Sequence, residues 1–223
     1  MNCHRLMCTM WFAHERVQGL VINMKTGARI HVVLFVLEVA ALIHDLHAFG
    51  LSMFTHYTID SNVLQMVVSG MIVYMILIKG KESIPVWLST LHLVCAVCLT
   101  ITFLISLFVL APKEGFAYYF LENVAPINHL IGPFLSVITF LFFEQSAPLP
   151  GRTIFMPMLA TLLYGGIALL LNVIKVLDGP YFFLRVYEVP AGTIVMWFVI
   201  IALLCIILSA LYWWGRRLRS RSV

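Results

Sequence analysis

Trp87–Ala111 reads WLSTLHLVCAVCLTITFLISLFVLA and contains no aspartate, glutamate, lysine or arginine. An apolar stretch of this length is typical of a helix that crosses the hydrocarbon core of a bilayer, which takes about 20 residues. The whole chain of 223 residues is 62% hydrophobic and 11% charged, whereas soluble domains carry about 25% charged residues. The sequence therefore predicts a polytopic membrane protein of the all-α class.

Six stretches have the length and apolar character of membrane-spanning helices, and glycine, proline or charged residues separate them. We expect these helices near residues 30–50, 58–78, 87–111, 124–143, 153–175 and 193–214. The predicted organisation is a six-helix transmembrane domain at 30–215, with an N-terminal extension at 1–29 and a basic tail at 216–223. The extension is either a cytosolic segment or the product of a start upstream of Met24, and it predicts no function.

Most lysine and arginine residues fall on one side of the predicted helices. If the N-terminus is cytosolic, Lys113, Lys175 and Arg185 lie on the outer side, and the rest of the 14 basic residues lie on the inner side. The positive-inside rule therefore predicts that both termini are cytosolic. This topology, together with contact to anionic lipids, accounts for the net charge of +4, so we expect membrane lipids and no nucleic acid as partners.

A polar block opens the second apolar stretch. Thr58, Ser61, Asn62, Gln65 and Ser69 fall at i, i+3, i+4, i+7 and i+11, which is one face of one helix. A polar face inside a membrane span must contact protein or water rather than lipid. This face is therefore the first candidate for a functional site.

The fourth apolar stretch carries an intramembrane histidine, His129. Counting along the helices at about 1.5 Å per residue places Thr58, Asn62 and His129 at similar depth near the outer leaflet. A neutral imidazole can take the proton of a threonine hydroxyl, so these residue types suit a nucleophile and its general base. The alternative is that His129 only forms a hydrogen bond between helices, and the sequence does not show that the two helices touch.

Two histidine clusters have residues that could bind a metal. His92, Cys95 and Cys98 lie on one helical face, but structural zinc normally takes four ligands and the sequence supplies no fourth. Small packing residues in a span are therefore the favoured interpretation. The cluster of His44, Asp45 and His47 is expected at the membrane interface. We expect no metal and no cofactor.

Two further features lie outside the polar face. Glu38 is in the middle of the first stretch and needs a partner or a proton, which the sequence does not identify. Tyr181, Phe182, Phe183 and Tyr187 follow the fifth stretch and are typical of an aromatic belt at the membrane interface. Tyr181 and Phe183 are also candidates to line an entrance for an acyl chain.

Three motifs resemble one known family. The block Thr58-Ile59-Asp60-Ser61-Asn62-Val63-Leu64-Gln65 resembles the start of a span in the androgen-induced membrane proteins, including the androgen-dependent TFPI-regulating protein, and their bacterial relatives. Asn128–Pro133 is similar to the histidine-bearing span of that family. Gly179–Leu184, followed by Pro190-Ala191-Gly192, is similar to its aromatic loop, with Phe182 where that loop often has proline. Motif order, spacing and span count agree over about residues 30–215.

The resemblance implies a six-helix membrane fold. For the animal members it also implies a threonine hydrolase that acts on fatty-acid esters of hydroxy fatty acids, with Thr58 as the nucleophile and His129 as the base. The similarity is closer to the bacterial branch, which implies a bacterial cell membrane and leaves the substrate open.

The leading hypothesis is a membrane-embedded ester hydrolase acting on a lipid ester or another small amphipathic substrate. Thr58 attacks the acyl carbonyl, His129 transfers the proton, and Asn62 or Asn128 donates to the oxyanion. A small transporter or lipid-binding protein without catalytic activity is the alternative, and a structural protein whose polar residues only join helices is a third possibility. The oligomeric state stays open.

Overall fold

The computed structural model describes the backbone of residues 3–222 and the side chains of residues 23–219. Every regular element within 3–222 is helical, as predicted for the all-α class. The predicted extension at 1–29 is part of one long helix from Cys3 onwards, and its side chains before Asn23 lie outside the described residues.

Five helical runs in the described chain are long and apolar enough to cross a membrane, and a sixth apolar run is shorter. The five are Asn23–Thr55, Tyr57–Ile78, Val86–Glu114, Gly151–Val173 and Ala191–Arg219, and the shorter one is Ile127–Phe143. Their positions follow the six predicted stretches closely. The apolar helices identify an integral, multi-pass membrane protein.

The helical elements follow one another in chain order, first those up to Phe120 and then those from Ile127 onwards. The first group is α1 (Cys3–Phe49), η1 (Gly50–Thr55), α2 (Tyr57–Val73), η2 (Tyr74–Ile78), α3 (Val86–Ile105), η3 (Ser106–Leu110), α4 (Ala111–Glu114) and α5 (Phe116–Phe120). The second group is η4 (Ile127–Ile131), α6 (Gly132–Ile138), η5 (Thr139–Phe143), η6 (Gly151–Phe155), α7 (Met156–Val173), η7 (Phe182–Leu184) and α8 (Ala191–Ser222).

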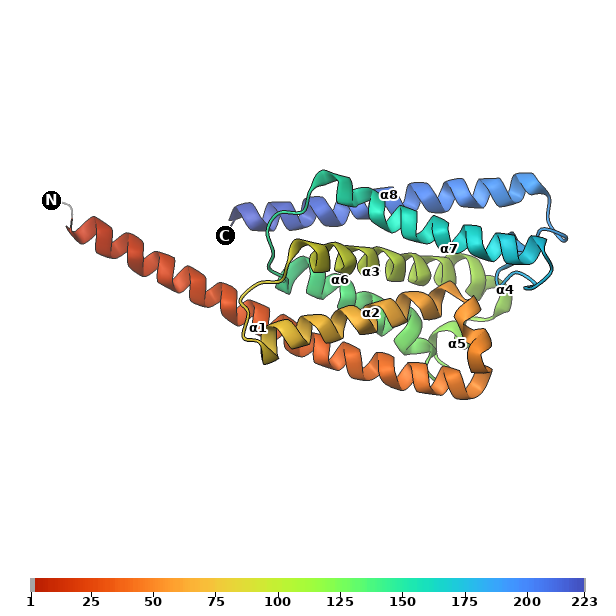
Figure 1. Ribbon diagram of the computed structural model, residues 1–223, viewed down its shortest axis with the longest axis horizontal. Helices are drawn as coiled ribbons and strands as arrows, with labels where there is room; N and C mark the ends of the chain where they lie inside the picture. The colour runs from red at the N-terminus through yellow and green to blue at the C-terminus, as the bar shows by residue number, and fades with distance from the viewer. Residues whose placement is uncertain (1–2, 223) are drawn as a thin grey trace.

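Helix α3 forms the centre of the bundle. Figure 1 shows α1 and α2 along one side and α7 and α8 along the other, and α3 contacts α2, α6, α7 and α8. In the most apolar window of the α3 run 61% of the residues are buried, against 17% in the α7 and α8 runs. The uncharged stretch Trp87–Ala111 therefore contains the core helix, because α2, α6, α7 and α8 pack against α3.

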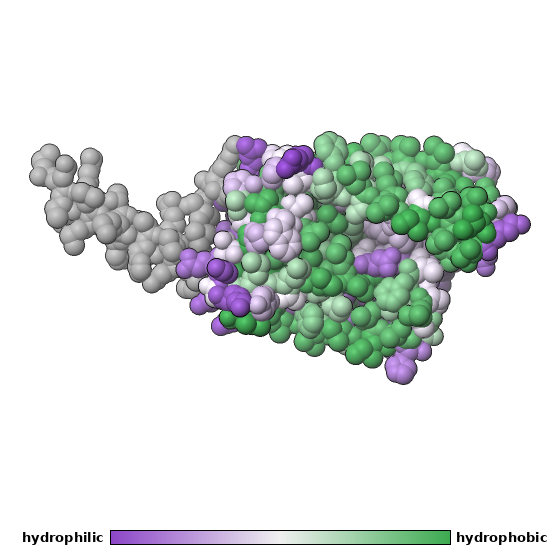
Figure 2. All heavy atoms as spheres, in the orientation of Figure 1, coloured by the Kyte–Doolittle hydropathy of each residue, from purple (hydrophilic) through white to green (hydrophobic). Residues whose placement is uncertain are grey.

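The outer surface of the bundle is apolar. In Figure 2 hydrophobic residues cover most of the visible face, and hydrophilic residues gather toward its two ends. Large side chains such as Val36, Leu163 and Leu203 are more than half exposed. An apolar surface of this extent suits contact with lipid rather than water.

Polar groups in the interior are joined by hydrogen bonds. At the end of the bundle away from Thr58, Glu144 accepts hydrogen bonds from Ser89 (2.5 Å), His92 and Arg216. His92 thus binds a carboxylate, and no group of three potential metal ligands occurs within the described part of the chain. This cluster attaches the last turns of α8 to α3 and to the segment after η5.

Candidate functional site

Thr58 and His129 lie on the wall of the same cavity. The cavity has a volume of about 230 Å³ and is bounded by α1, α2, the α4–α5 region and η4. Its other polar lining residues are His44, Asp45, His56, Glu114, Tyr118, Tyr119, Glu122, Asn123, Asn128 and Tyr181. The two predicted catalytic residues, far apart in the sequence, thus line one cavity, and their catalytic pairing stays a prediction.

The imidazole ring of His129 faces two backbone carbonyl groups, those of Ala125 and Tyr119. Nδ1 lies 3.2 Å from the carbonyl oxygen of Ala125, which can only accept a hydrogen bond. In the tautomer that donates from Nδ1, Nε2 carries the lone pair that a general base needs. The rings of Tyr119 and Phe120 pack edge-on at 5.4 and 6.2 Å and limit how the imidazole can turn.

A proline explains the irregular backbone around His129. Segment η4 is π-helical, a form that is common at functional sites. Pro133 has no N–H, so it cannot donate to the carbonyl group of Asn128 one π-turn earlier. The side-chain nitrogen of Asn62 supplies that hydrogen bond instead, at 3.2 Å. This contact joins α2 to the segment that carries His129.

Asn62 and Asn128 differ in the capacity that they have left to donate. The Asn62 nitrogen donates to the carbonyl oxygens of Thr58 (2.8 Å) and Asn128, so both of its N–H groups are used. The Asn128 nitrogen donates to Asp45 at 2.8 Å. Asn128 lines the cavity, and the second N–H of its side chain remains to donate a hydrogen bond there. The bond from Asn128 to Asp45 is a feature that sequence reasoning missed.

Tyr181 separates the first cavity from a second one. The second cavity is apolar, has a volume of about 60 Å³, and is lined by Tyr181, Phe183 and Thr58 among others. The Tyr181 and Phe183 rings stack at 5.4 Å, and Phe183 also stacks on Trp197 at 4.9 Å. Thr58 and Tyr181 thus line both cavities, whereas Phe183 lines the apolar one.

The Tyr181 hydroxyl faces the start of α2. Burial raises the pKa of Tyr181 to about 12, although the Thr58 hydroxyl and the backbone N–H groups of Thr58 and Tyr57 act in the opposite direction by hydrogen bonding. The phenol is therefore neutral at physiological pH. Its oxygen faces the first-turn N–H groups of α2, which have no acceptor within the helix.

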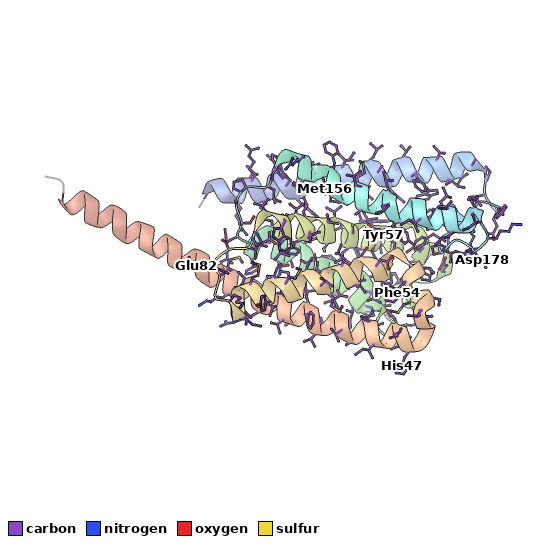
Figure 3. All side chains as sticks on the ribbon, in the orientation of Figure 1. His47, Phe54, Tyr57, Glu82, Met156 and Asp178 are labelled. Atoms are coloured by element: carbon purple, nitrogen blue, oxygen red, sulfur yellow. The ribbon has the colours of Figure 1, made fainter. Side chains whose placement is uncertain are left out.

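Neighbouring residues fix the position of this helix start. Tyr57, labelled in Figure 3, lies between α2 and α7, and its hydroxyl is 2.7 Å from Thr161 Oγ1. Tyr164 donates to the carbonyl oxygen of Thr55 at 2.6 Å. These two bonds attach both sides of the η1–α2 junction to α7, so the position of Thr58 depends on the packing of α7.

The rest of the polar face of α2 joins helices. Gln65 accepts a hydrogen bond from Ser136 at 2.6 Å and donates to Ser69 at 2.9 Å. Ser69 in turn lies 3.0 Å from Nδ1 of His31 on α1. Gln65 and Ser69 thereby connect α2 to α6 and α1.

No family model matches the chain, and no curated protein or solved structure matches it. The resemblance to the androgen-induced membrane proteins therefore stays a prediction from three sequence motifs.

Proposed function

We propose that this chain is a six-span membrane ester hydrolase with cytosolic termini, in which Thr58 is the nucleophile and His129 the general base. The observation that supports this proposal is the shared cavity: Thr58 and His129 line it together, and Thr58 also lines the adjacent apolar cavity. An ester whose acyl chain occupies the apolar cavity would have its carbonyl carbon beside Thr58. The polar cavity would then hold the alcohol part.

The reaction follows from the donors and acceptors at the site. Nε2 of His129 takes the Thr58 hydroxyl proton as Oγ1 bonds to the acyl carbon, and the imidazolium then protonates the departing alkoxide as the ester C–O bond breaks. A water molecule attacks the acyl-threonine, again with His129 as base, which releases the fatty acid and restores Thr58. Asp45 lines the same cavity and favours the imidazolium by its charge.

Two sets of donors are available to the oxyanion. One is the pair of backbone N–H groups of Tyr57 and Thr58 at the start of α2, where the helix dipole also favours negative charge. The other is the remaining N–H of Asn128. In the resting site the Tyr181 hydroxyl faces the two backbone groups, so a substrate carbonyl would replace it there.

The substrate class follows from the two cavities. The apolar one suits the chain of a fatty acid, in line with the esters that the family resemblance implies. The resemblance also favours a bacterial cell membrane, where membrane lipids would surround the bundle.

The experiment compares matched variants of the purified protein in detergent. We expect Thr58→Ala and His129→Ala to hydrolyse a fluorogenic long-chain acyl ester at least about 100-fold more slowly than the parent. The controls are Thr193→Ala, a threonine in the first turn of α8, and His47→Ala, an exposed histidine at the end of α1. A fluorophosphonate probe should label Thr58 in the parent and in both controls. Hydrolysis at the parental rate by a folded Thr58→Ala protein would reject the proposal.

Transport of a small solute is a second candidate function, and the polar interior favours it. Hydrogen bonds join α1, α2 and α6 through His31, Ser69, Gln65 and Ser136 in the middle of an otherwise apolar bundle. Solute flux into proteoliposomes without cleavage of any ester would support this function over hydrolysis.

A further inference from the structure

Glu38 is a buried acid whose oxygens have no partner. It lies on α1 with 2% of its surface exposed, and neither Oε1 nor Oε2 accepts a hydrogen bond. Asn62 Oδ1 is a third buried acceptor without a partner. A buried polar group left in this state costs about 1–3 kcal/mol, and a charged one costs more. We therefore expect a bound proton or cation to satisfy the two Glu38 oxygens and Asn62 Oδ1.

The orientation of the Asn62 amide is fixed by the two carbonyl groups to which its nitrogen donates. Its nitrogen faces two backbone carbonyl oxygens, those of Thr58 and Asn128, which cannot donate. Rotation of the amide by 180° would place oxygen against oxygen. The unpartnered Oδ1 is therefore held on the side that faces Gly132.

These oxygens lie against Gly132, which has no side chain to keep them apart. A Cβ atom built there would lie 2.8 Å from Glu38 Oε1, 2.9 Å from the Ile127 carbonyl oxygen and 3.2 Å from Asn62 Oδ1. The three nearest atoms are thus all oxygens, and they come from α1, η4 and α2. The Ile127 oxygen already accepts the Gly132 N–H across the π-turn, which leaves it one lone pair.

The surroundings supply no counter-charge. No ion pair within residues 23–219 involves Glu38. The titratable neighbour on α3 is the fully buried thiol of Cys95, while His31 and Asp45 lie two turns away on either side along α1. An isolated carboxylate inside an apolar bundle is strongly disfavoured, so the cluster requires one positive charge.

We propose that Glu38, Asn62 and the Ile127 carbonyl group bind one sodium ion. A proton on Glu38 would form one hydrogen bond, from one carboxyl oxygen to one acceptor, and the remaining oxygens of the cluster would still have no partner. A monovalent cation neutralises the carboxylate and interacts with every oxygen of the cluster, whereas a divalent ion would leave excess charge. Sodium sites in membrane proteins use the same combination of side-chain oxygens and carbonyl groups from an irregular helical segment. This site does not depend on the proposed hydrolysis.

The test is the thermal unfolding of the full-length protein in detergent at pH 8.5, in NaCl or in choline chloride of equal ionic strength. Sodium should raise the melting temperature by about 3 °C for each tenfold increase above its dissociation constant. Glu38→Gln should abolish this dependence, whereas Glu82→Gln, in the exposed loop between η2 and α3, should retain it.

Infrared spectroscopy of the parent protein gives a second readout that needs no variant. At alkaline pH the spectrum in choline chloride should show the band of a protonated carboxyl group. A low concentration of sodium should remove that band. If that band persists and the melting temperature is the same in both salts, Glu38 holds only a proton and the sodium site is rejected.

Discussion

The side-chain nitrogen of Asn62 lies 3.2 Å from the carbonyl oxygen of Asn128, and it fills the hydrogen bond that Pro133 cannot donate. The same nitrogen donates to the carbonyl oxygen of Thr58 at 2.8 Å. One amide therefore holds the first turn of α2 against the π-helical turn of His129. The contact thus joins the segment that carries Thr58 to the segment that carries His129.

Replacement of Asn62 by alanine should destabilise the protein by about 1–3 kcal/mol, because the buried Asn128 carbonyl group loses its donor. The measurement is the midpoint of thermal unfolding in detergent. Val67→Ala is the control, since Val67 is on the exposed side of α2 at 48% exposure. Equal midpoints for the two variants would show that the Asn62 bond does not hold the helices together.

Gly132→Ala should also destabilise the protein, because the added methyl group would meet three oxygens at 2.8–3.2 Å. Gly166→Ala in α7 is a matched control, since outside the adjoining backbone of its own helix no atom lies within 4 Å of its Cβ position. That control should be neutral or stabilising by up to about 1 kcal/mol, as for glycine to alanine in a helix. Comparable loss in both variants would contradict the close approach of Glu38 and Asn62 to Gly132.

Arg216→Met should cost about 3–5 kcal/mol, because it removes one partner of a buried ion pair. Glu144 and Arg216 are 3% and 8% exposed, so water cannot replace the lost contact. The double variant Glu144→Gln with Arg216→Met should lose less, since no carboxylate is left uncompensated. Arg152→Met, at an exposed arginine, is the control. A loss no larger than in this control would mean that the pair contributes nothing to stability.

The same ion pair predicts how stability depends on pH. Burial alone would raise the pKa of Glu144, but Arg216, His92 and Ser89 outweigh it and lower the pKa from 4.5 to about 2. A lowered pKa in the folded state adds stability that is complete above the unfolded value and is lost as pH falls toward the folded one. The melting temperature should therefore fall below about pH 5. Glu144→Gln should flatten that fall, and an unchanged profile would contradict the assignment.

Tyr181→Phe should raise the rate at which a fluorophosphonate labels Thr58. The variant keeps a ring that can stack on Phe183 but removes the hydroxyl that faces the backbone N–H groups of Tyr57 and Thr58. Those groups would then be free to stabilise the developing oxyanion. Phe182→Leu, in the same loop, controls for changes in loop packing. A fall in labelling would instead make the Tyr181 hydroxyl an essential donor.

Much of the candidate site could be predicted from residue types and helical spacing. The period of the polar block predicted a buried face, and Ser61, Asn62, Gln65 and Ser69 are all buried. The depth count predicted that Thr58 and His129 lie near one level in the membrane; that level stays a prediction, and both residues line one cavity. Contacts between helices could not be predicted in this way, because side chains such as Asp45 and Asn128 meet only after the helices pack.

The sequence by itself determined the class of protein and the candidate residues. Length and hydropathy require apolar helices, since each backbone N–H and C=O in a bilayer must be satisfied within the chain. The tertiary structure alone decided which polar groups became partners. In the folded protein His92 forms a hydrogen bond with Glu144 rather than with Cys95, and the Glu38 carboxyl group faces other oxygens and no donor. The physical reason is that the helical period determines which residues share a face, whereas the packing of helices determines which atoms of a neighbouring helix those residues contact.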